Sequence, residues 1–162
     1  MKRNISATVQ VISFLLLIFL NAVPPAHAQQ CSPAGVAGGY GFTITGTLLL
    51  PTGAVPLAAV GKALLNTDGG FSATEARSVG GEFADETLKG TFTVNSDCTG
   101  TLTADVFESG KLVRTSVLSI MFDDHMKELR AVQKSLTLPD GSSVPVVITV
   151  EGKKTLSSGE QD

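Results

Sequence analysis

The sequence has 162 residues, with 12 basic and 15 acidic side chains and a formal net charge of −3. This length is that of one domain with its own core. The basic residues form no cluster that would suit nucleic acid or an anionic membrane surface, so neither is expected as a partner.

Residues 1–28 have the features of a secretory signal peptide. Lys2 and Arg3 precede the apolar run Val11–Leu20, and Ala26-His27-Ala28 supplies a small-x-small cleavage pattern. The apolar run is shorter than the roughly 20 residues that cross a bilayer as a helix. We therefore expect cleavage after Ala28, no membrane anchor in the mature chain, and a secreted or periplasmic location.

The mature chain is expected to form one β domain over residues 29–152, followed by a flexible polar tail over 153–162. It keeps two cysteines, Cys31 and Cys98, which in an exported protein favour a disulfide. A metal or redox pair is disfavoured because the chain has no CxxC and the mature chain has one histidine, His125. No cofactor is expected.

Short segments rich in Thr, Val, Phe and Leu alternate with glycine turns, which is typical of strands. Tyr40–Leu50 begins with alternation that places Tyr40, Phe42 and Ile44 on one face. Leu57–Leu65 follows a Pro- and Gly-containing turn, and Asp68-Gly69-Gly70 precedes Phe71–Val79. Residues 82–84 either pair or remain loop. Further strands are expected over residues 87–95, 99–107, 111–122, 128–136 and 144–150.

This order predicts an all-β fold, an antiparallel up-and-down meander of about eight strands. A meander of that size removes its exposed edges by closing into a barrel. A β-sandwich is the alternative.

Four segments carry a resemblance: Cys31, Gly39-Tyr40-Gly41-Phe42, Gly90–Asn95 and Asp97–Thr101. Together they resemble a group of small secreted bacterial proteins of unknown function, in which Tyr usually stands at the position of Phe92. That group is similar to calycin-like barrels, including the allene oxide cyclase barrel. The resemblance implies an eight-stranded barrel whose interior holds one small apolar molecule. No cyclase motif is present, so no catalytic residue is carried over.

The densest polar cluster is Asp123, Asp124, His125 and Glu128. Carboxylates and imidazole could bind a metal, but a turn that contains two aspartates explains the same residues, and Lys127 and Arg130 could pair with the acids. We favour the turn and expect no metal site. The chain also lacks the G-x-S-x-G pattern of hydrolases.

We favour a non-enzymatic barrel that binds a small apolar ligand. The residues expected to contact it are Tyr40, Phe42, Leu57, Phe92 and Arg114. For Glu75, Asp105 and Glu108 the pattern leaves open which face is inside, and Arg114 is either a buried partner of an acid or a strand-end residue. The apolar segment Leu48–Leu65 forms either two core strands or a lip at the barrel mouth. An extracellular structural or interaction module and an isomerase or cyclase remain as alternatives.

Overall fold

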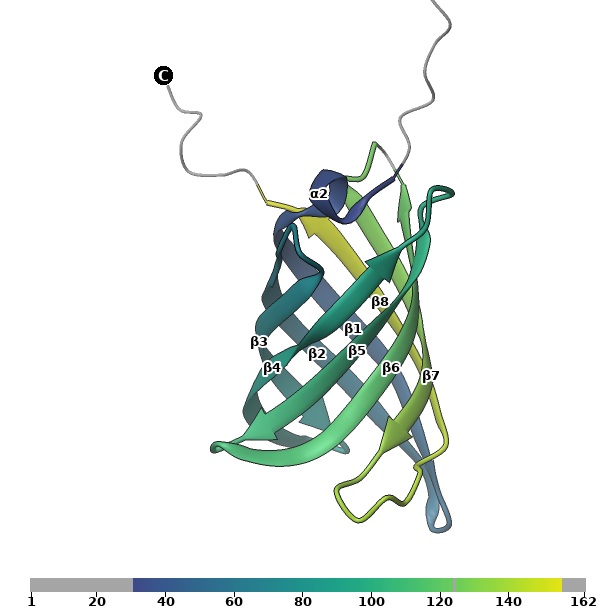
Figure 1. Ribbon diagram of the computed structural model, residues 1–162. Coiled ribbons are helices and arrows are strands. Elements are labelled where there is room, and N and C mark those ends of the chain that lie inside the picture. The colour runs from purple at the N-terminus through teal and green to yellow at the C-terminus, as the bar shows by residue number, and fades with distance from the viewer. Residues whose placement is uncertain (1–30, 124, 156–162) are drawn as a thin grey trace, which may run out of the picture.

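The computed structural model describes residues 31–123 and 125–155, which form a single barrel with a short helix at one end (Figure 1). The expected signal peptide, residues 1–28, and residues 156–162 of the expected tail lie outside the described residues. The elements are α2 (Pro33–Val36), β1 (Gly38–Leu50), β2 (Gly53–Leu65), β3 (Gly70–Val79), β4 (Glu82–Val94), β5 (Thr99–Glu108), β6 (Lys111–Asp123), β7 (Glu128–Thr137) and β8 (Val146–Lys154). No helix among them has the length and hydrophobicity to cross a bilayer.

Each strand pairs in antiparallel fashion with the next strand of the chain, and β1 also pairs with β8. The last pairing runs from Tyr40 opposite Lys154 to Leu48 opposite Val146, and it closes the sheet. The predicted up-and-down meander is therefore confirmed as a closed barrel, and the sandwich alternative is excluded.

Several strand boundaries differ from those expected. β2 begins at Gly53 rather than at Leu57, because residues 53–56 pair with β1. Residues 82–84, which the pattern left open as strand or loop, pair with β3 as the start of β4. At the other end of the chain, Lys153 and Lys154, which the sequence had placed in the tail, belong to β8. Lys154 is held there because its ammonium group donates to the Gly35 carbonyl oxygen at 3.2 Å and lies 5.8 Å from the centre of the Tyr40 ring.

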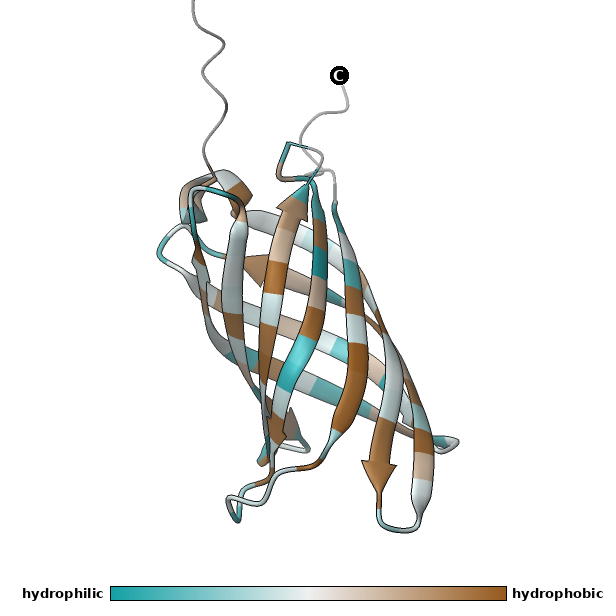
Figure 2. Ribbon diagram, turned by 90° about the vertical axis from the view of Figure 1, so that its right-hand side faces the viewer, coloured by the Kyte–Doolittle hydropathy of each residue, from teal (hydrophilic) through white to brown (hydrophobic). Residues whose placement is uncertain are grey.

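Apolar and polar residues alternate along the strands (Figure 2), so that one face of the sheet fills the barrel. Some inward positions are glycine because the facing side chains need their space. A Cβ atom on Gly61 would lie 2.6 Å from Phe42 Cζ and 2.9 Å from Glu75 Cβ. Gly61 therefore allows a phenyl ring and a carboxylate to share the interior beside β2.

The N-terminal segment covers one end of the barrel, where α2 lies (Figure 1). A disulfide joins Cys31 to Cys98 in the β4–β5 turn, which confirms the predicted pair. Val36, the last residue of α2, is fully buried. The Tyr40 hydroxyl lies 2.8 Å from the Val36 carbonyl oxygen and 3.0 Å from that of Met126, and it donates its proton to these two acceptors. Burial raises the pKa of Tyr40 to about 12, so this phenol stays a donor at physiological pH.

Replacing both cysteines, Cys31→Ser with Cys98→Ser, is expected to destabilise the barrel without changing its topology. The disulfide spans a separation of 67 residues. A loop of that length stabilises the folded state by about 4 kcal/mol through the entropy of the unfolded chain. Urea unfolding of the double variant and of the oxidised protein measures the difference. Equal free energies of unfolding for the two proteins would show that the disulfide does not stabilise the folded barrel.

Candidate functional site

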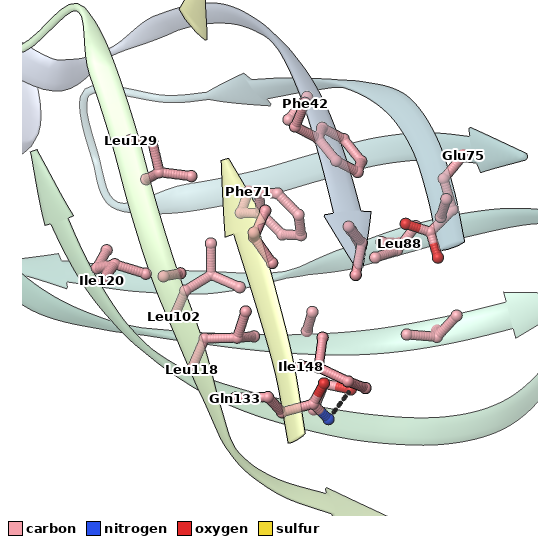
Figure 3. Close-up of a pocket in the computed structure, with 18 of the residues that line it drawn as sticks. Phe42, Phe71, Glu75, Leu88, Leu102, Leu118, Ile120, Leu129, Gln133 and Ile148 are labelled. Atoms are coloured by element: carbon pink, nitrogen blue, oxygen red, sulfur yellow. Dashed lines mark hydrogen bonds between the residues drawn. The ribbon is translucent and has the colours of Figure 1, made fainter. Parts of the chain in front are cut away.

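The barrel interior contains a cavity of about 90 Å³. Its wall is mainly apolar and is built from inward positions of all eight strands in the described part of the chain. The labelled apolar side chains in Figure 3 point into this space, among them Phe42, Phe71, Leu102, Leu118, Leu129 and Ile148. Such a pocket suits a small apolar molecule.

Four of the five residues expected to contact a ligand line this cavity: Tyr40, Phe42, Leu57 and Arg114. The fifth, Phe92, is buried in the core but does not line the cavity. Phe92 lies two residues before the end of β4, close to the barrel end that α2 covers, and its backbone N–H donates to the Gly69 carbonyl oxygen. Phe92 therefore packs into the core at the covered end of the barrel and does not contact the cavity.

A cluster of charged side chains lies inside the barrel beside the cavity. The Arg114 guanidinium donates to both carboxylate oxygens of Glu86, each at 2.7 Å, and to Glu75 Oε1 at 3.3 Å. Arg77 donates to Glu86 Oε1 at 2.6 Å and to Glu108 Oε2 at 3.2 Å. Glu86 is therefore held between two arginines, with a bidentate contact to one of them.

Strand register places this cluster towards the end of the barrel opposite α2. Arg77 is two residues from the end of β3 at Val79, and Arg114 is three residues after β6 begins at Lys111. The β3–β4 and β5–β6 turns form that end, whereas Cys98 in the β4–β5 turn is bonded at the covered end. The cavity is thus apolar over most of its wall and charged towards one mouth.

Glu75 and Glu86 are both buried, with side-chain exposures of 1% and 0%. Burial raises the pKa of Glu75 to about 7, a hydrogen bond from its protonated carboxyl group to Glu86 adds to the rise, and Arg114 opposes it. Burial also acts to raise the pKa of Glu86, but hydrogen bonds from Arg114 and Arg77 outweigh it and lower that pKa to about 2. Of this pair, Glu86 is the permanent anion and Glu75 titrates near neutrality.

The two oxygens of Glu75 have different surroundings. Oε1 accepts from Arg114, whereas Oε2 is buried and accepts no hydrogen bond from the described residues. Figure 3 shows the Glu75 carboxyl group near Leu88, among the apolar side chains of the cavity. A buried polar atom without a hydrogen-bond donor is costly and calls for an explanation, such as contact with a bound molecule.

A second polar pair lines the cavity farther along the wall. The Gln133 amide nitrogen donates to Ser116 Oγ at 3.0 Å and to the Ser135 carbonyl oxygen at 3.0 Å (Figure 3 shows the Gln133 side chain). The Gln133 amide nitrogen and Ser116 Oγ therefore contact each other within the protein. Among the side chains of the wall, Glu75 is the one with a fully buried oxygen that has no hydrogen-bond donor in the described residues.

The acidic residues around the β6–β7 turn form ion pairs on the surface. Arg130 contacts Asp123 Oδ2 at 3.4 Å and Glu128 Oε2 at 3.6 Å, and the Lys153 ammonium lies 2.9 Å from Glu128 Oε1. Asp124 lies outside the described residues. Within 31–123 and 125–155, no three His, Cys, Asp or Glu side chains are grouped so that they could hold a metal ion.

Sequence reasoning left Glu75 unassigned to a face and did not select Arg77, Glu86, Ser116 or Gln133. Glu75 and Arg77 could have been assigned to the inner face of the sheet, because alternation along β3 places both on the same side as Phe71 and Ala73.

The segment Leu48–Leu65 contributes to both the interior and the outer surface of the barrel. Leu57 and Leu65 line the cavity, whereas Val60 and Leu64 are exposed on the outer wall.

No family model matches the chain, and no curated protein matches it. Among solved structures, the chain is similar to that of EF1p2_mFAP2b bound to DFHBI. The two are 11% identical with a TM-score of 0.49, and the alignment covers 77% of this chain and 100% of that one. A likeness at this level assigns no function to the chain.

The pKa of Glu75 predicts how stability depends on pH. Because this pKa is about 7 in the folded protein and 4.5 as the ordinary value, the folded state binds more protons between these limits. Stability is therefore expected to fall as pH rises from about 4.5 to about 7, by up to ~1.4 kcal/mol per pH unit. The lowered pKa of Glu86 acts below this window, where stability is lost as pH falls towards about 2.

Urea unfolding at several pH values within that window measures the slope. Glu75→Gln should remove most of it, since the amide does not titrate. Glu151→Gln, a change at an exposed position of β8, is the matched control and should retain it. A wild-type slope in Glu75→Gln would mean that Glu75 titrates normally.

Proposed function

We propose that this protein binds a small, mainly apolar molecule inside the barrel and does so without catalysing a reaction. The observation that carries the proposal is the cavity of about 90 Å³, whose wall is apolar apart from the charged cluster and the Ser116–Gln133 pair. A core built only for stability is close-packed and leaves few voids larger than a water molecule. An interior space bordered by an unpartnered carboxylate oxygen supports binding rather than packing alone.

The cavity volume limits the size of the ligand. An engineered apolar cavity of about 150 Å³ binds benzene or xenon. At about 90 Å³ the present cavity is smaller, so the proposed ligand has only a few non-hydrogen atoms. Long-chain lipids are too large for this space.

The disulfide and the features of residues 1–28 support an extracytoplasmic location for the protein and its ligand. Disulfides form and persist in oxidising compartments, and the Cys31–Cys98 bond is consistent with such a compartment. The signal-peptide features of residues 1–28 agree with export. We propose a periplasmic or secreted protein related to the calycin-like barrels that its Cys31 and Asp97–Thr101 segments resemble.

An extracellular interaction module is the second candidate, because apolar side chains are exposed on the outer wall. Val60 on β2 is 59% exposed and Val147 on β8 is 62% exposed. Both strands flank β1, so these side chains lie on one side of the barrel. Such exposed apolar surface is a feature of interaction sites.

Xenon binding distinguishes the two candidates, since xenon enters apolar cavities that are empty and accessible. Ala59 lines the cavity, whereas the adjacent Ala58 is exposed on the outer wall. Ala59→Leu is expected to fill the cavity and abolish xenon binding, while Ala58→Leu leaves it unchanged. Xenon-129 NMR of the three proteins provides the measurement.

Absence of xenon binding in the unmodified protein would contradict a ligand-binding interior and favour the interaction module. Xenon binding that is lost equally in both variants would place the bound gas outside the cavity. Circular dichroism of each variant checks that the barrel has folded.

A further inference from the structure

The charges inside the barrel do not balance when all are ionised. Three carboxylates, Glu75, Glu86 and Glu108, contact two guanidinium groups, Arg77 and Arg114. The cluster therefore has one negative charge in excess. Because Glu86 is held by both arginines and Glu108 is partly exposed at the mouth, the excess falls on Glu75.

The two arginines are already engaged by protein carboxylates. Arg114 makes its bidentate contact with Glu86 and a further contact with Glu75, and Arg77 bridges Glu86 and Glu108. A ligand carboxylate would have to displace one of these carboxylates and would add a second negative charge to a buried site. Burial of unpaired charge is costly, so the cluster disfavours anionic ligands.

We infer that the ligand of the cavity carries a hydrogen-bond donor, an ammonium or hydroxyl group, which Glu75 Oε2 accepts while the apolar part lies against the cavity wall. This inference rests on the proposed function and names the chemical class of the ligand. It uses a carboxylate that lines the cavity and has one buried oxygen, Oε2, which accepts no hydrogen bond from the described residues. The Glu75 side chain lines the cavity and is 1% exposed, so bulk solvent does not supply this donor.

An ammonium ligand also restores the charge balance of the cluster. The charged groups around Glu75 are Arg77 on the same strand, Glu86 on β4, Glu108 on β5 and Arg114 on β6, whereas Lys62 on β2 is exposed. The pKa of Glu75 is raised to about 7 by burial, so below that pH a bound ammonium must displace a proton. Affinity for an amine is therefore expected to rise as pH increases through about 7, and affinity for an alcohol to change less.

Three compounds with the same carbon skeleton provide the test: butylamine, 1-butanol and butanoate. Their binding to the purified protein is measured by chemical-shift titration of its backbone amides at a pH above 7, with xenon as a probe of the cavity itself. Butylamine and 1-butanol are expected to bind within the barrel, with butylamine about tenfold tighter than butanoate or more, as a charge-assisted hydrogen bond provides. In Glu75→Gln the preference for butylamine should be lost while xenon still binds, and Glu151→Gln should behave as the unmodified protein.

Two other results overturn the inference and are distinguishable from each other. If xenon binds but butanoate binds as tightly as butylamine in the unmodified protein, Glu75 does not select a donor, and ligand binding in the interior still stands. If neither xenon nor any of the three compounds binds, the proposed function fails as well. The unmodified protein alone separates these outcomes, so the test does not depend on how well Glu75→Gln folds.

Discussion

Pairing of β1 with β8 turns the sheet into a closed barrel, and every inward side chain must then share one interior. This constraint determines the rest of the structure. Inward positions are apolar or glycine where strands crowd, as at Gly61 beside Phe42 and Glu75. One end is covered by α2 through Val36, Tyr40 and the disulfide, so the interior is closed on that side. The charged groups of the interior lie away from that cover.

Closure also explains why the buried charges form one cluster. A carboxylate inside the barrel cannot reach bulk water, so its stability depends on neighbouring cations. Glu86 has two such neighbours, and its pKa is lowered to about 2. Glu75 receives one hydrogen bond, from Arg114, and burial together with the neighbouring Glu86 raises its pKa to about 7. The two pKa values differ because the donors to Glu86 outweigh its burial, whereas the single donor to Glu75 does not.

Much of the fold could be predicted from local patterns. Alternation along Tyr40–Ile44 and turns such as Asp68-Gly69-Gly70 indicated the strands, and export features indicated that Cys31 and Cys98 would pair. The interior cluster could not be predicted, because it depends on which face of each strand turns inward and on pairing between distant strands.

Strand irregularities further limited the sequence prediction. Leu112 and Arg114 have the same parity on β6, and alternation places them on one face. The register with β5 shifts between Val106 and Phe107, so that Arg114 faces the interior while Leu112 is 40% exposed. A bulge of this kind is set by the fit between two strands and the twist of the barrel, which a single strand does not reveal.

The most direct test of this account is a crystal structure of the protein soaked with butylamine. The account predicts electron density inside the barrel, with the carbon chain against Phe42 and Leu118 and the nitrogen within hydrogen-bond distance of Glu75 Oε2. Density confined to the outer wall, or an interior filled by rearranged side chains, would contradict it.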